Sequence, residues 1–112
     1  RGIDMEGLEL TAFQIISSVG TARSCYIEAI QAAKKSDYEE AEKLIKEGDE
    51  AFIEGHDAHA GLLQKEASGE GNTVNLLILH AEDQLMSAEA FKTIALEFID
   101  AYKRIEALEK KA

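Results

Sequence analysis

Proline and tryptophan are absent from the 112 residues, and three tyrosines and four phenylalanines are the only aromatic side chains. Without proline, every residue keeps the backbone N–H that a helix interior needs, so long unbroken helices are possible. The residues that remain are rich in Ala, Leu, Ile, Glu and Lys, which are good helix formers. The composition therefore predicts an all-α protein, and the length fits a single domain.

Cysteine and basic residues are also scarce. Cys25 is the only cysteine, which excludes an internal disulfide and agrees with a cytoplasmic location. The chain carries 12 basic and 22 acidic residues, a net charge of −10. This balance argues against a nucleic-acid partner, which needs a clustered basic surface. No apolar run reaches the roughly 18 residues of a membrane-spanning helix, so we expect no direct insertion into a membrane.

Apolar residues recur at intervals of three and four in three long segments. This spacing predicts helices over about 8–35, 38–67 and 73–109. Residues 8–112 are therefore expected to form one antiparallel three-helix domain. Residues 1–7 are expected to be a disordered start, or a remnant that does not belong to the domain.

Polar residues that favour helix starts precede the second and third segments. Ser36 or Asp37 can cap the second helix, and Asn72 or Thr73 is expected to cap the third. A glycine-rich stretch at 68–72 separates these two helices and predicts a loop.

Three glycines lie inside the predicted helices. Gly48 and Gly55 are seven residues apart on one side of the second helix, and Gly20 lies in the first. Because glycine has no side chain, we expect all three to let a neighbouring helix approach closely.

The third helix is apolar on more than one side, most clearly over Leu76, Leu77, Ile78 and Leu79. A helix that is apolar on several sides is buried on several sides. A bundle of only three long helices has too thin a core to bury it so fully. We therefore expect the chain to associate with copies of itself, with the third helix at the shared centre.

A polar stripe interrupts this apolar helix. His80, Asp83, Gln84 and Ser87 are spaced by three and four residues, so they share a helix face. Burying polar groups costs free energy unless they are paired or used. The stripe is therefore the first candidate for a functional site.

The other two histidines, His56 and His59, lie on the second helix. If the second and third helices form a hairpin about the loop, His59 lies level with His80, and His56 with Asp83. Three interpretations follow from the residues. His80 could carry a phosphoryl group as phosphohistidine, supported by Gln84, Ser87 and Arg23. The four residues His56, His59, His80 and Asp83 could bind a divalent metal. A buried polar network could instead only fix helix packing.

Several segments resemble a known family, the lactose/cellobiose-type IIA component of the bacterial sugar phosphotransferase system. They include Phe13-Gln14-Ile15-Ile16, Gly20-Thr21-Ala22-Arg23-Ser24 and Ala67-Ser68-Gly69-Glu70. The most specific is His80-Ala81-Glu82-Asp83-Gln84-Leu85-Met86, where the family reads roughly His-small-Gln-Asp-His-Leu-Met. The resemblance extends over essentially the whole chain.

The resemblance implies a function and an assembly. His80 would accept a phosphoryl group from the phosphocarrier HPr. It would pass the group to a cysteine of a IIB component, for uptake of a lactose/cellobiose-type sugar. The assembly would be a trimer with nine helices. Asp83 would lie near its axis, where three copies could bind a divalent cation such as Mg²⁺.

The chain departs from the family pattern at three places. Glu82 replaces a usual Gln, Gln84 a usual His, and His59-Ala60 a usual Gln-Thr. Since a carboxylate repels an incoming phosphoryl group, Glu82 is expected to reduce or abolish transfer, unless it orients His80. His59 is expected to help His80 from the second helix.

Overall fold

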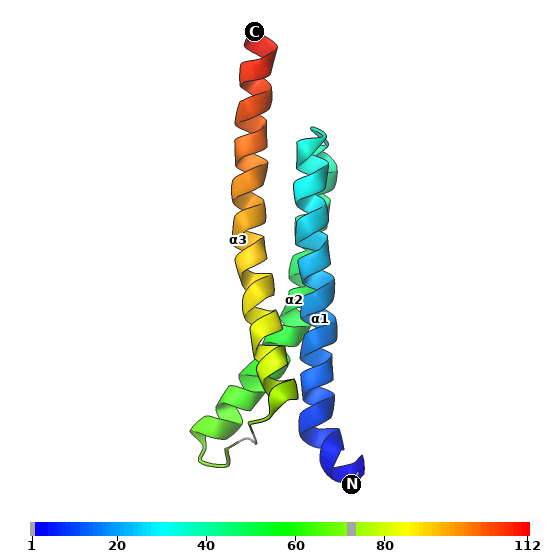
Figure 1. The fold of residues 1–112 in the computed structure, drawn as a ribbon, viewed down its shortest axis with the longest axis vertical. Helices are drawn as coiled ribbons and strands as arrows, with labels where there is room; N and C mark the ends of the chain where they lie inside the picture. The colour runs from blue at the N-terminus through cyan, green and yellow to red at the C-terminus, as the bar shows by residue number, and fades with distance from the viewer. Residues whose placement is uncertain (1, 72–73) are drawn as a thin grey trace.

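The computed structural model describes residues 2–71 and 74–112, and these residues form three helices joined by short turns (Figure 1). The helices are α1 (Gly2–Lys34), α2 (Tyr38–Ala67) and α3 (Leu76–Lys111). The predicted all-α fold is therefore confirmed. Within the described ranges, none of the helices is both long and apolar enough to cross a membrane.

The helix boundaries differ from the expected ones at two starts. α1 begins at Gly2, six residues before the expected start at Leu8. The start of α3 is at Leu76, three residues after the expected position.

Side-chain caps account for the starts of α2 and α3. The Asp37 carboxylate accepts a hydrogen bond from the Glu40 backbone N–H at 3.2 Å, which confirms one of the two expected caps. The Asn75 side-chain oxygen accepts from the Ile78 backbone N–H at 2.9 Å, so Asn75 caps α3. The expected caps Asn72 and Thr73 lie outside the described residues.

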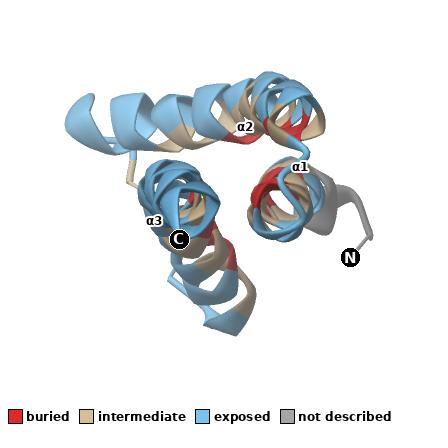
Figure 2. Cartoon of the chain, turned by 90° about the horizontal axis from the view of Figure 1, so that it is seen from above, coloured by how far each residue is buried: buried red, intermediate tan, exposed pale blue. Residues whose placement is uncertain are grey.

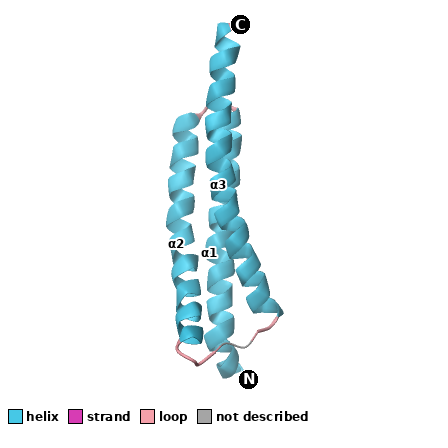
Figure 3. Ribbon diagram, turned by 90° about the vertical axis from the view of Figure 1, so that its left-hand side faces the viewer, coloured by secondary structure: helices cyan, strands magenta, loops and turns pink. Residues whose placement is uncertain are grey.

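α1 is the helix that holds the bundle together. It packs along both α2 and α3, whereas α2 and α3 meet at few points. Figure 1 shows the end of α2 diverging from the other helices as it approaches the loop. Figure 3 shows α3 continuing past the ends of its neighbours, in a molecule of 64 × 24 × 20 Å. α2 and α3 therefore run antiparallel, as expected for a hairpin. Each of them packs mainly against α1, and they make few contacts with each other.

The core is a narrow seam where the three helices meet (Figure 2). Ile15, Val19 and Tyr26 of α1 are its largest fully buried side chains. α3 contributes its inner side, which we define as its buried residues Ala81, Leu85, Ala88, Ala95 and Ile99. Most of these are alanines, so helix axes come close without large side chains between them.

Two of the three helical glycines behave as expected. A Cβ on Gly48 would lie 2.6 Å from the Tyr26 ring, and one on Gly55 would lie 2.7 Å from Val19 Cγ1. Both glycines therefore allow the close approach of α1 and α2. The expectation for Gly20 is wrong within the chain, because a Cβ there would meet nothing within 4 Å.

A polar network links all three helices at mid-height. The buried Tyr26 hydroxyl of α1 donates a hydrogen bond to Asp49 Oδ1 of α2 at 2.6 Å. Lys92 Nζ of α3 lies 3.0 Å from Asp49 Oδ2. Burial and the hydrogen bond to Asp49 raise the pKa of Tyr26 well above its usual range, so the phenol stays neutral.

Candidate functional site

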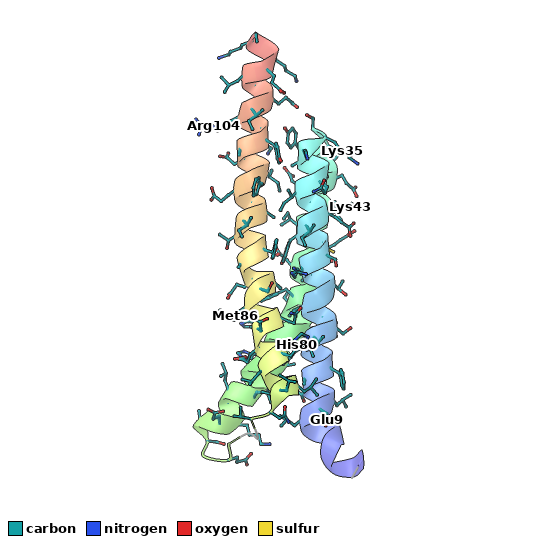
Figure 4. The ribbon with its side chains drawn as sticks, viewed as in Figure 1. Glu9, Lys35, Lys43, His80, Met86 and Arg104 are labelled. Carbon is teal, nitrogen blue, oxygen red and sulfur yellow. The ribbon has the colours of Figure 1, made fainter. Side chains whose placement is uncertain are left out.

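His80 lies in the second turn of α3, one residue before the buried Ala81 (Figure 4). Its side chain is exposed, and in the described part of the chain it has no hydrogen-bond or ion-pair partner. An imidazole has two ring nitrogens, of which the neutral form offers one as a lone-pair donor to an electrophile. The position therefore gives an accessible nucleophile directly after the apolar first turn of α3.

The other members of the predicted stripe surround His80 as the helical spacing requires. Gln84 and Ser87 are half-buried, and Asp83 is exposed. At 1.5 Å per residue, Gln84 lies about 6 Å and Ser87 about 10 Å further along the helix axis. Gln84 is therefore close enough for its amide to reach a group held on His80, whereas Ser87 lies at the far edge of that reach.

Glu82 does not share this face. Residues two positions apart on a helix are separated by about 200°, so Glu82 points to the opposite side of α3 from His80. Its carboxylate is in contact with Nε2 of His59 on α2. The expected level of His59 along the bundle is correct to about one turn, but His59 meets Glu82 and not His80.

His59 and Glu82 lie where α2 begins to diverge. Both line a pocket of about 180 Å³ between the two helices and α1. The His59 side chain is only 16% exposed, whereas Glu82 keeps 47% of its side chain exposed. The rest of the wall is mainly apolar and comprises Ile15, Leu62, Leu63, Val74, Ile78, Leu79, Ala81 and the carboxylate Glu66.

Arg23 and His56 are not brought to His80 within the chain. The Arg23 guanidinium lies 4.9 Å from the centre of the Phe91 ring, a cation–π contact. Phe91 is about 16 Å further along α3 than His80 by helical rise. The His56 side chain is 60% exposed, and its Nδ1 lies 3.9 Å from Asp57 on its own helix.

This arrangement also bears on the metal interpretation. Among the described residues, no group of three or more His, Cys, Asp and Glu side chains is placed to hold a metal ion. His56, His59, His80 and Asp83 therefore do not form one ligand set among the described residues. The metal site considered for these four residues is not formed within one chain.

α3 exposes large apolar residues away from the seam, and we call these its outer side. Met86, labelled in Figure 4, is 57% exposed, and Leu79 is 54% exposed. The other members are Leu76, Ile94, Phe98, Ile105 and Leu108. Monomeric proteins rarely expose apolar residues along the whole length of a helix.

Comparison with known proteins identifies the family. Residues 10–103 match the family described as PTS system, Lactose/Cellobiose specific IIA subunit. The chain is 42% identical over 100 residues to the lichenan-specific phosphotransferase enzyme IIA component of Bacillus subtilis (strain 168), covering 89% of this chain and 91% of that one. It is 34% identical over 102 residues to the lactose-specific EIIA component of Staphylococcus aureus (strain N315), covering 91% and 99%.

A solved structure gives the same result. The cellobiose-specific enzyme IIA from Bacillus anthracis superposes with a TM-score of 0.87 at 42% identity, covering 90% of this chain and 93% of that one. The sequence match, the curated relatives and the shared three-helix fold agree over nearly the whole length. The chain therefore belongs to the lactose/cellobiose-specific IIA family of the sugar phosphotransferase system.

Proposed function

We propose that the chain is a phosphocarrier that accepts a phosphoryl group from HPr on His80 and passes it to a cysteine of a IIB component. The phosphotransferase system that contains the IIB component would import a sugar of the lactose/cellobiose class. The chain would act in the cytoplasm. The observation that carries this proposal is the exposed His80 imidazole, which has no partner among the described residues, in a chain of this family.

The chemistry requires two displacements at phosphorus. A lone pair on a ring nitrogen of His80 attacks the phosphoryl group, a P–N bond forms, and the bond to the donor breaks. The IIB thiolate then attacks the same phosphorus, a P–S bond forms, and neutral His80 is released. Gln84 would donate an amide hydrogen bond to the phosphoryl oxygens, and Ser87 is a weaker candidate. Arg23 would have to act from another copy of the chain.

We further propose that the chain forms a trimer of nine helices through the outer side of α3. The apolar residues exposed there run from Leu76 to Leu108, which spans nearly the whole helix. Burying them against two other copies would remove them from water, which is the main favourable term in association. This also agrees with the narrow seam of a single chain.

Asp83 is the candidate ligand for a cation in such a trimer. Its carboxylate is exposed and offers the oxygen ligands that Mg²⁺ prefers. Among the described residues no group of three metal-binding side chains forms within one chain, so Asp83 fits a cation only where three copies of it converge. The cation would balance three like charges that otherwise repel one another.

Intact mass spectrometry tests the phosphocarrier proposal. The chain is incubated with phosphoenolpyruvate, the general phosphotransferase enzyme and HPr, beside His80→Ala and the matched control His56→Ala. We expect one phosphoryl group per chain, lost in acid, in the wild type and in His56→Ala, and none in His80→Ala. A phosphoryl group that persists in His80→Ala would overturn the assignment.

A further inference from the structure

A histidine of α2 and a carboxylate of α3 contact each other beside the phosphoryl-acceptor candidate. His59 and Glu82 are far apart in the sequence and lie on different helices, but Nε2 of His59 meets the Glu82 carboxylate. A histidine and a carboxylate in contact form a pair that is charge-balanced when the histidine is protonated. The two residues are therefore best understood as one pair.

Glu82 lies close enough to His80 to affect it electrostatically. The two residues are about 3 Å apart along the axis of a helix whose full diameter is about 10–12 Å, so their head groups lie roughly 10 Å apart. This is comparable to the screening length at physiological salt. An unbalanced carboxylate would therefore oppose the arrival of a doubly negative phosphoryl group.

The contact with His59 changes both the position and the charge of Glu82. It holds the carboxylate on the α2 side of α3, away from the face of His80. A protonated His59 also cancels the carboxylate charge. His59 is only 16% exposed, so the pair is partly shielded from solvent. Its immediate surroundings are the apolar wall of the 180 Å³ pocket, with Glu66 as the other charged group in that wall.

We propose that His59 is a positioning residue for phosphoryl acceptance, acting on His80 through Glu82. This proposal rests on the phosphocarrier function proposed above. His59 touches neither His80 nor the phosphoryl group; it retains the Glu82 carboxylate on the α2 side of α3, and in its protonated form it balances the charge that would otherwise repel that group. The expected opposition of Glu82 to transfer is thereby removed.

The test is a double-mutant cycle on the initial rate of phosphorylation by phosphorylated HPr. The variants are His59→Gln, Glu82→Gln and the double variant, which places an amide at both positions. From a unit charge and a dianion about 10 Å apart in a water-like medium, we expect His59→Gln to be about fourfold slower at low salt. Glu82→Gln and the double variant should stay within about twofold of the wild type, because neither leaves an unbalanced carboxylate.

Two further measurements separate this effect from a folding defect. Lys92→Gln breaks a different charge pair between α2 and α3, about 18 Å along the helix from His80, and its rate should match the wild type. The deficit of His59→Gln should also shrink at 0.5 M salt, because screening weakens a charge effect and not a packing defect.

The outcomes are distinct. A slow His59→Gln that is rescued by the added Glu82→Gln supports the proposal. A His59→Gln variant with the wild-type rate, or a double variant as slow as His59→Gln, overturns the proposal and leaves the phosphocarrier function standing. A wild-type chain that takes up no phosphoryl group overturns both.

Discussion

The two sides of α3 differ in what they contact. The inner side is completed within the chain, because Ala81, Leu85 and Ala88 pack against α1 in one buried cluster. The outer side is equally rich in apolar residues, but in one chain it faces solvent. Adjacent residues, Leu85 at 4% and Met86 at 57% exposure, show the contrast. The inner side therefore accounts for the fold of one chain, and the outer side for its proposed association.

Truncation of these two neighbours gives the largest expected difference. Leu85→Ala removes a buried side chain and leaves a cavity, so we expect a loss of about 3 kcal/mol in the free energy of unfolding. Met86→Ala should change the stability of the dissociated chain by less than about 0.5 kcal/mol. Denaturant unfolding at low protein concentration measures both. Equal losses in the two variants would contradict the distinction between the sides.

The glycines of the seam provide the next comparison. Gly55→Ala places a methyl group against Val19 and should cost about 2 kcal/mol through overpacking. Gly20→Ala meets no neighbour within 4 Å and should gain up to about 1 kcal/mol from higher helix propensity. The midpoint temperature of thermal unfolding should fall for Gly55→Ala and rise for Gly20→Ala. A shift of both midpoints in the same direction would show that the seam is packed differently.

Breaking the polar network of Tyr26, Asp49 and Lys92 should have a smaller effect on stability. Tyr26→Phe keeps the buried ring but removes the hydroxyl that donates to Asp49. A hydrogen bond to a charged acceptor contributes about 1.5 kcal/mol, and Asp49 would still have Lys92. We expect a stability loss of that size with an unchanged rate of phosphoryl acceptance. A lower rate would mean that the network also serves the site.

The sequence predicted the helices well. The three-and-four spacing of apolar residues predicted three helices, and such residues, among them Ile15, Val19 and Tyr26 of α1, form the core. Helical periodicity reports burial directly, whereas caps depend on single side chains. Both Ser36 and Asp37 could cap α2, and only the coordinates show that Asp37 accepts from Glu40.

The candidate site was predicted less completely. His80, Asp83, Gln84 and Ser87 follow from spacing along one helix, because a helix fixes the angle between its own residues. The partner of His59 depends on how α2 turns and diverges relative to α3. Sequence arithmetic gave its level along the bundle but not its direction, so it assigned His59 to His80 and missed Glu82. Arg23 was likewise expected near His80, but it packs on Phe91.

Substitutions on the outer side should have the smallest effect on the fold of the dissociated chain. They should have a clear effect on the assembly of chains. Leu79→Ser combined with Met86→Ser should leave the helix content unchanged, because both residues are exposed in one chain. The variant should weaken the proposed trimer by removing apolar contacts. Sedimentation equilibrium should show three chains per particle for the wild type and a lower mass for the variant. A wild-type monomer would contradict the role given to the outer side.

The most direct test of the central claim is to identify which of the three histidines carries the phosphoryl group. Imidazole ¹H–¹⁵N spectra, recorded before and after incubation with phosphoenolpyruvate, the general enzyme and HPr, distinguish His56, His59 and His80. We predict that the ring nitrogen resonances of His80 alone move to positions typical of phosphohistidine. A phosphorylated His56 or His59, or three unchanged rings, would contradict the account.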